Sequence, residues 1–425
     1  MNASPGLPAR RAALRLLDAV LRRGETLDQA DSAAMGGIPG LADRALARAI
    51  AGETLRWLVD LDALIDGATR QKLAPDAKAR AVLRLMLAQW LRLGTPPHAV
   101  VATGLPLLAG GPRRLAHGVF GALVRGKARL PDAPSLPAEV ADRWGERAAG
   151  IARGIAELPP LDLSFREPEE AGRMAALLAE AEAGGTAPPP VSLAPGHLRV
   201  ARGARVEELP LYAEGGWWVQ DFAAALPARL LGAGSGRRVL DLCAAPGGKT
   251  LQLAAAGWRV TALDISDKRL DLLRANLART GLAADIVVAD ALGWAPDQPF
   301  DAILLDAPCT ATGTIRRHPD VIHRIGPARI AEMADLQRRL LARAAGWLAP
   351  GGRLVYAVCS LEPEEGEAQA APDGPAAGLI PDPVGADELP AGLAPTAQGW
   401  VRTDPAMMAE QGGLDGFFIA RWRKG

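Results

Sequence analysis

The sequence predicts an α/β fold in its second half, built on a Rossmann-like sheet and preceded by an all-helical domain and a small α+β domain. Apolar residues recur every three or four positions from Arg10 to about Lys127, which is typical of amphipathic helices. From Arg238 onward, strand-like and helix-like segments alternate, and a glycine-rich turn follows the first of these strands. The length of 425 residues also exceeds what one hydrophobic core organises. We therefore expect domains at 1–130, 131–230 and 231–425.

The first domain combines helical periodicity with an excess of positive charge. Breaks that contain Gly and Pro divide it into about five expected helices with short loops. Residues 1–130 carry 19 Lys+Arg against 10 Asp+Glu, whereas residues 131–425 carry 29 against 38, so a net charge of zero conceals this asymmetry. Segregated positive charge favours a polyanionic partner, most often RNA or DNA. The alternative is that the arginines only decorate solvated helix faces.

The middle of the chain has mixed signals. The proline-rich stretch Leu130–Pro137 predicts a linker. After it we expect helices near 139–157 and 167–183, and short strands around Leu198–Val200 and Trp217–Val219. These elements predict the small α+β domain.

The last domain shows the clearest alternation of strands and helices. In chain order we expect a strand at Val239–Leu242, a helix at 248–256, a strand at Val260–Leu263, a helix at 267–280, strands at Ile286–Val288 and Ala302–Leu305, a helix at 328–347, and strands at Arg353–Val358 and Gly416–Trp422. Strands joined by such helices predict parallel pairing in a sheet that is covered on both faces. The ligands of such sheets bind beyond the carboxyl ends of the strands. Residues 366–399, rich in Pro, Gly and Ala, are typical of a loop excursion.

The turn after the first of these strands is the strongest local signal. It reads Cys243-Ala244-Ala245-Pro246-Gly247-Gly248-Lys249. Adjacent glycines let a backbone approach a ligand closely, and the start of the next helix offers N–H groups that suit a ligand carboxylate. The spacing matches neither the dinucleotide nor the triphosphate loop. Taken alone, the turn could be purely structural.

Three acids lie where later strands end. Asp264 ends the second strand, Asp290 follows the third and Asp306 ends the fourth. Each alone could be a helix N-cap or a solvated turn residue. All three are expected at one sheet edge, where an acid after the second strand is positioned to bind ribose hydroxyls. Together with the turn, they predict a cofactor site.

Two cysteines are expected at the same edge. Cys309 follows Asp306, and Cys359 follows the strand that ends at Val358. An isolated cysteine is usually a small buried hydrophobe, but two at neighbouring strand ends beside an acid predict a reactive thiol. Lys249 is the nearest candidate cation to favour a thiolate, unless it is an exposed first-turn lysine.

The remaining composition limits the environment of the protein. Its three cysteines, Cys243, Cys309 and Cys359, are far apart and form no C-x-x-C, which argues against a disulfide framework and a structural zinc site. No apolar run is long enough for a membrane helix, and the N-terminus does not read as a secretory signal. We therefore expect a cytoplasmic protein without a membrane or metal partner. The sequence does not determine the oligomeric state, and a monomer is the default expectation.

The motifs of the last domain closely resemble those of the RNA cytosine-C5 methyltransferases, the family that includes the Nop2/Sun proteins and bacterial 16S ribosomal RNA enzymes. The matching motifs, in order over about the last 200 residues, are Cys243–Lys249, Asp264, Asp290, Asp306-Ala307-Pro308-Cys309, Ile315–Asp320, Cys359-Ser360 with Pro363-Glu364-Glu365, and Asp415-Gly416-Phe417-Phe418. The resemblance implies that residues 243 to 249 with Asp264, Asp290 and Asp306 surround S-adenosylmethionine. It also implies that Cys359 is the nucleophile and that Cys309 assists release of the methylated base.

Such an enzyme activates an unreactive carbon. A thiolate that adds to C6 of cytosine makes C5 nucleophilic enough to take a methyl group, and loss of the C5 proton then releases the cysteine. Asp306 could hydrogen-bond the base, and burial would favour its protonated form and let it donate a proton. The implied substrate is 16S ribosomal RNA, with cytosine 967 as the family site.

Two further features place the chain within the family. The run Arg316–Asp320 is similar to that of the bacterial ribosomal branch, and the front domain is similar to the antitermination factor NusB, which implies RNA binding. Val358 stands where the family commonly has Thr, and Leu161–Arg166 only loosely matches the usual Arg-Val-Asn element. These departures leave the thiol environment and some substrate contacts open.

Several alternatives remain at this point. An amino-group methyltransferase of the same fold would carry an Asn/Asp-Pro-Pro-Tyr element in place of the motif that ends at Cys309, and a non-catalytic RNA-binding factor would have lost the cofactor acids. His318 and His323 have no partners at metal spacing, which favours loop structure or substrate contacts. Trp217 and Trp218 could stack on a flipped base, but core packing is favoured.

Overall fold

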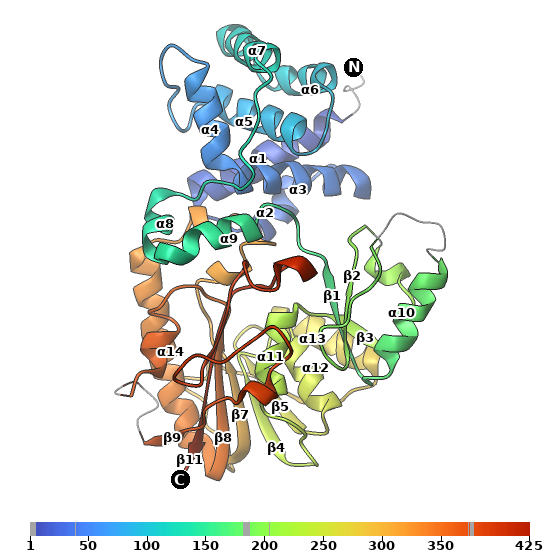
Figure 1. Cartoon of the computed structure of the whole chain (residues 1–425), viewed down its shortest axis with the longest axis vertical. Helices are drawn as coiled ribbons and strands as arrows, with labels where there is room; N and C mark the ends of the chain where they lie inside the picture. The colour runs from blue at the N-terminus through green and yellow to red at the C-terminus, as the bar shows by residue number, and fades with distance from the viewer. Residues whose placement is uncertain (1–5, 39, 182–187, 204, 373, 375–377) are drawn as a thin grey trace. The chain divides into compact units, whose positions relative to one another are not determined.

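The computed structural model describes residues 6–38, 40–181, 188–203, 205–372, 374 and 378–425. The chain forms two compact units, Met1–Leu158 with Ile315–Ile325, and Pro159–Thr314 with Gly326–Gly425 (Figure 1). From the sequence we expected three domains. In the structure, the linker and the two helices after it group with the helical unit, and so does the segment Ile315–Ile325 from the second half of the chain.

The helical unit begins with more helices than the sequence predicted. Its helices are α1 (Leu7–Arg23), α2 (Leu27–Ala34), α3 (Leu41–Arg56), α4 (Leu58–Gly67), α5 (Lys78–Leu91), α6 (Pro97–Gly104), α7 (Gly110–Arg125), α8 (Ala138–Trp144) and α9 (Ala148–Gly154). Seven of these lie before Lys127, where about five were expected. Two causes are local. Thr26 and Gln29 form a capping box that starts the short α2, and Trp57 leaves helical geometry between α3 and α4.

The small sheet of the second unit has three antiparallel strands. Their order is β2 (His197–Val200), β1 (Leu161–Phe165) and β3 (Trp217–Val219), with α10 (Glu170–Ala181) packed nearby. The strand β1 was not predicted, although its apolar residues alternate with period two. Its buried Asp162 accepts hydrogen bonds from the Arg199 guanidinium at 2.6 and 2.8 Å. Burial alone would raise the pKa of Asp162, but the hydrogen bonds from Arg199 and His197 outweigh it and lower that pKa.

The large sheet confirms the predicted Rossmann-like fold and corrects its last pairings. The strands are β4 (Arg238–Leu242), β5 (Arg259–Asp264), β6 (Asp285–Val288), β7 (Phe300–Asp306), β8 (Leu348–Val358), β9 (Leu379–Pro381), β10 (Val401–Thr403) and β11 (Phe417–Lys424). Strands β8, β7, β4, β5 and β6 pair in parallel in that order. The last strand, β11, is antiparallel to β8, and the described residues between the two contain no long crossover helix of the kind that parallel pairing needs. The intervening excursion adds the short helix α15 (Glu367–Ala370) and the antiparallel β9 and β10.

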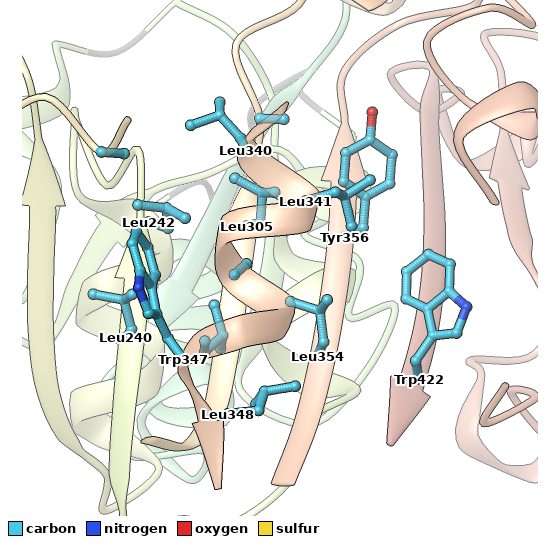
Figure 2. Packing of buried hydrophobic residues seen from close by; sticks show 14 of the residues in the cluster. Leu240, Leu242, Leu305, Leu340, Leu341, Trp347, Leu348, Leu354, Tyr356 and Trp422 are labelled. Carbon is cyan, nitrogen blue, oxygen red and sulfur yellow. The ribbon is translucent and has the colours of Figure 1, made fainter. Parts of the chain in front are cut away.

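Helices cover both faces of this sheet. Figure 2 shows α14 (Pro327–Trp347) against one face, where its Leu340, Leu341 and Trp347 pack with Leu305 and Tyr356. The other face packs against α11 (Phe222–Arg229). Full burial of one such apolar side chain contributes about 1.5–3 kcal/mol. The two packed faces hold the strands in register and thereby fix where their carboxyl ends lie.

Two more helices complete the unit. These are α12 (Gly248–Ala255) and α13 (Asp267–Thr280), which pack together on β5. None of the helices in the described part of the chain is long and apolar enough to cross a membrane.

Candidate active site

The turn between β4 and α12 is closely packed. Gly247 has φ 108°, and a Cβ atom there would lie 2.5 Å from the Leu273 side chain, so only glycine fits. Cys243 also takes a left-handed conformation, with φ 65°. Burial raises the pKa of the Cys243 thiol, so this cysteine is not the reactive thiol. The turn therefore brings backbone, rather than side chains, to the edge of the sheet at the start of α12.

The acid at the end of β5 organises that turn. Asp264 is 2% exposed, and its carboxylate accepts hydrogen bonds from the backbone N–H groups of Ala245 at 3.0 Å and Ser266 at 2.9 Å. Arg269 donates to the Ala245 carbonyl oxygen at 2.5 Å. Asp290 is exposed and accepts from the backbone N–H of Leu292 at 2.9 Å. The two acids thus differ, because the Asp264 carboxylate is hydrogen-bonded to the backbone of the turn, whereas Asp290 is exposed to solvent.

Asp306 forms an ion pair rather than standing alone. Its Oδ2 lies 2.7 Å from Nζ of Lys249, which is 8% exposed and lies 5.3 Å from the centre of the Phe417 ring. Burial would lower the pKa of Lys249, but the Asp306 carboxylate outweighs it and raises that pKa. Lys249 therefore stays protonated. From the sequence we expected Asp306 to contact the base through its own carboxyl group, and the structure adds Lys249 as its ion-pair partner.

The two cysteines expected at the sheet edge lie together. Sγ of Cys309 is 3.4 Å from Sγ of Cys359, and both residues are partly buried. The hydrogen bond with Cys359, together with burial, raises the pKa of Cys309. Cys309 is thus held as a thiol that can donate to the Cys359 sulfur. Val358, the unusual neighbour, is fully buried in the strand.

A buried glutamate links the two cysteine loops. Glu365 is 0% exposed, and its carboxylate accepts from the backbone N–H of Thr310 at 2.9 Å, from the Thr310 hydroxyl, and from Ser360 Oγ at 2.5 Å. Gln337 of α14 donates to it at 3.0 Å. Burial raises the pKa of Glu365 against the effect of these hydrogen bonds. Thr310 and Ser360 each follow a cysteine in the chain, so Glu365 fixes both cysteines relative to one another.

Sequence reasoning gave no role to Glu365 or to Asp241. Asp241 lies inside β4, is 0% exposed and accepts from the Thr250 hydroxyl at 2.5 Å. Burial raises its pKa to about 7. An acid in the middle of an apolar strand was a usable signal, because ionisable side chains are seldom buried without a partner.

Other residues considered from the sequence lie elsewhere. His318 and His323 belong to the segment that groups with the helical unit. Trp217 and Trp218 are buried, and their Nε1 atoms donate to the Pro210 carbonyl at 2.7 Å and to Gln220 at 2.8 Å, which confirms core packing. Within the described ranges, no group of three His, Cys, Asp or Glu side chains could hold a metal ion.

Known proteins resemble the chain over nearly its whole length. The model of the family "16S rRNA methyltransferase RsmB/F" matches residues 228–423, and that of the NusB family matches residues 7–107. The ribosomal RNA small subunit methyltransferase B of Xanthomonas campestris is 35% identical over 388 residues, covering 87% of this chain and 88% of that protein. Its counterpart in Xylella fastidiosa (strain Temecula1) is 35% identical over 439 residues, covering 98% of each.

Solved structures agree on the fold. The crystal structure of PH0851 covers 99% of each chain with a TM-score of 0.71 at 23% identity. A methyltransferase homolog from Pyrococcus horikoshii covers 67% of this chain and 94% of its own, with a TM-score of 0.54 at 29% identity. Both predicted parts, the helical front and the methyltransferase sheet, thus have counterparts in known proteins. The chain belongs to the 16S rRNA methyltransferase RsmB/F family and is an S-adenosylmethionine-dependent RNA methyltransferase.

Proposed function

We propose that this enzyme methylates C5 of a cytosine in 16S ribosomal RNA, at position 967, through a covalent adduct of Cys359 with C6 of the base. The observation that carries the proposal is the 3.4 Å distance between the sulfur atoms of Cys309 and Cys359. A methyltransferase that acts on an amino nitrogen needs no thiol, whereas this site holds two. The site also lies at the sheet edge where such folds bind their ligands.

The residues of the turn fit S-adenosylmethionine. We infer that residues 243 to 249 with Asp264, Asp290 and Asp306 surround it. The absence of a side chain at Gly247 leaves room for a close backbone approach, and the start of α12 offers N–H groups to a carboxylate. Asp264 fixes the turn, and the exposed Asp290 is free to accept from hydroxyl groups. When bound, the cofactor supplies an electrophilic methyl group on its sulfonium.

Different side chains at this site carry out different parts of the reaction. The Cys359 thiolate forms a bond to C6, and the electron pair of the C5=C6 double bond moves toward the ring carbonyl and C5. The ion pair of Asp306 and Lys249 lies beside this ring, where Asp306 orients the base and the ammonium stabilises developing negative charge. C5 then takes the methyl group.

Release requires the adduct to break. The C5 proton leaves to a base, the C5=C6 double bond forms again, and the Cys359 sulfur departs as a thiolate. Cys309 assists this step, because its raised pKa keeps it a thiol that can donate a hydrogen bond to the departing sulfur. These thiols must stay reduced, and we therefore place the reaction in the cytoplasm.

Bisulfite sequencing of 16S ribosomal RNA tests the proposed product. In cells that lack the gene, one 5-methylcytosine should disappear, and the wild-type gene supplied on a plasmid should restore it. The same plasmid with Cys359→Ala should not. An unchanged 5-methylcytosine pattern would overturn the proposed base and carbon, while the loss of a different methylated nucleotide would redirect the substrate assignment.

A further inference from the structure

One exposed face of the helical unit carries positive charge without counter-charges. We define the α7 surface as the basic side chains on α7 and just after it, namely Arg113, Arg114, His117, Arg125, Lys127 and Arg129. All six are exposed. Within the described residues, none of the six takes part in a side-chain hydrogen bond or ion pair. No Asp or Glu occurs in the sequence between Asp76 and Asp132.

The helical repeat gathers the charges of α7 on one side. At 100° per residue, Arg113, His117, Arg114 and Arg125 fall within about 120° of arc. Val119 lies on the opposite side of the helix, Ala116 and Phe120 lie between it and Arg113, and all three are buried. The rise per residue separates Arg113 from Arg125 by about 18 Å along the axis. The α7 surface is thus a charged strip with a cationic group at each end.

One position between the charged ends of the α7 surface has no side chain. Gly118 lies between its charged ends, and nothing stands within 4 Å of the place where its Cβ would be. A glycine inside a helix costs about 1 kcal/mol relative to alanine. Gly118 keeps the strip open to a chain that lies along it.

Three other exposed arginines of this unit are neutralised by nearby carboxylates. Arg22 lies 3.1 Å from Asp18, Arg23 lies 2.6 Å from Glu25, and Arg48 lies 2.6 Å from Asp31. These three arginines are therefore explained as locally paired residues on solvated helix faces. The basic residues of the α7 surface are not, because they have no such partners. The unpaired charge favours an external anion.

We propose that the α7 surface binds the phosphate backbone of the RNA substrate. Exposed cationic side chains along one side of a helix suit the phosphates of a nucleic acid backbone, which supply most non-specific affinity. A membrane surface fits less well, because Leu115 is the one large hydrophobic side chain exposed on the described α7. This inference rests on RNA being the substrate, but not on which base or carbon is methylated.

The test compares two triple variants of the full-length enzyme that remove equal charge. The first combines R113Q, R114Q and R125Q, and the control combines R22Q, R23Q and R48Q from locally paired positions. Binding of a fluorescein-labelled 16S ribosomal RNA fragment is measured by anisotropy between 50 and 300 mM KCl. The first variant should bind about 10- to 100-fold more weakly, with a salt slope lower by about two to three, because each lost phosphate contact removes about 0.9. The control should stay within about threefold of wild type.

Two further readouts separate this proposal from the reaction. The affinity for S-adenosylmethionine and the melting temperature should match wild type in both variants. Equal RNA affinity in the two variants would overturn the proposal, and so would an unchanged salt slope, the result expected if the surface binds an acidic protein. Mass spectrometry of the product reports the methylated base in the same reactions, so an error in the proposed chemistry would be seen independently of binding.

Discussion

Asp241 couples the stability of the catalytic unit to pH. It is wholly buried in β4, and burial raises its pKa from 3.8 to about 7. In the unfolded chain the same carboxyl ionises near its usual value, so between about pH 4 and 7 the folded state binds more protons. The stability that its protonation contributes is fully present below pH 4 and is lost as the pH rises toward 7.

The variant D241N tests this dependence. Asn keeps an acceptor for the Thr250 hydroxyl but cannot ionise. The free energy of unfolding of wild type, relative to D241N, should therefore decrease as the pH rises from 4 to about 7 and then level off. Urea denaturation at several pH values measures it. The exposed D335N serves as the control and should show no such trend. A wild-type advantage that is independent of pH would contradict the raised pKa.

The sequence predicted the position of the candidate site residues better than the contacts that hold them in place. Asp306 lies beside Lys249, and Cys309 beside Cys359, because strand ends gather at one sheet edge, a rule that needs only the strand pattern. Glu365 was missed because its role depends on donors from separate loops and from α14. The ion pair of Asp306 was likewise not expected, since the length and direction of the Lys249 side chain are set by packing.

At the scale of elements, the segment Ile315–Ile325 belongs to the helical unit, although it follows β7 in the chain. It starts six residues after Cys309. Within the helical unit, Arg56 of α3 donates to the carbonyl oxygens of Ile155 at 2.7 Å and Arg316 at 2.9 Å. His323 Nε2 donates to the Leu55 carbonyl oxygen at 2.7 Å. These hydrogen bonds hold the segment Ile315–Ile325 within the helical unit.

Removing the Arg56 guanidinium should loosen this segment. In R56M the carbonyl groups of Ile155 and Arg316 lose a buried donor, and each unsatisfied group costs about 1–3 kcal/mol. Trypsin should then cleave after Arg316 or Arg317 several-fold faster than in wild type. The control R48M lies on the same helix but in exposed ion pairs, and should change little. Equal cleavage rates in the two variants would show that Arg56 does not hold the segment.

The sequence predicted correctly the helices and strands that follow from apolar periodicity. It did not predict the features that depend on strand pairing or on a single residue. The parallel strands and α12 to α14 follow from runs of apolar residues of the right length. The direction of β11 depends on how residues 366–399 return to the sheet, for which no periodic signal exists. The number of front helices depended on the cap at Thr26 and the bend at Trp57, each a matter of one residue.

At the scale of the whole molecule, a deletion of the front helices is an ambiguous test of RNA binding, because the helical unit also includes Ile315–Ile325. Deleting residues 1–130 is expected to weaken RNA binding more than cofactor binding. The deletion would also remove the contacts of Ile315–Ile325, whose Ile315, Val321 and Ile322 are buried. A loss of activity after deletion would thus have two causes. Variants of the α7 surface in the full chain avoid this ambiguity.

The paired cysteines support the proposed chemistry over an amino-group methyltransferase, which has no use for two thiols 3.4 Å apart. The division of labour between Cys359 and Cys309 is therefore the central claim.

One measurement tests that claim most directly. Wild type, C309A, C359A and, as a control at an exposed position, D335N are each incubated with S-adenosylmethionine and a 16S ribosomal RNA fragment and run on a denaturing gel. C309A should accumulate a covalent protein–RNA band, because the adduct forms but releases slowly, whereas C359A should form no band and no methylated product while still binding the cofactor. D335N should behave as wild type. A covalent band with C359A, or methylation retained by it, would contradict the account.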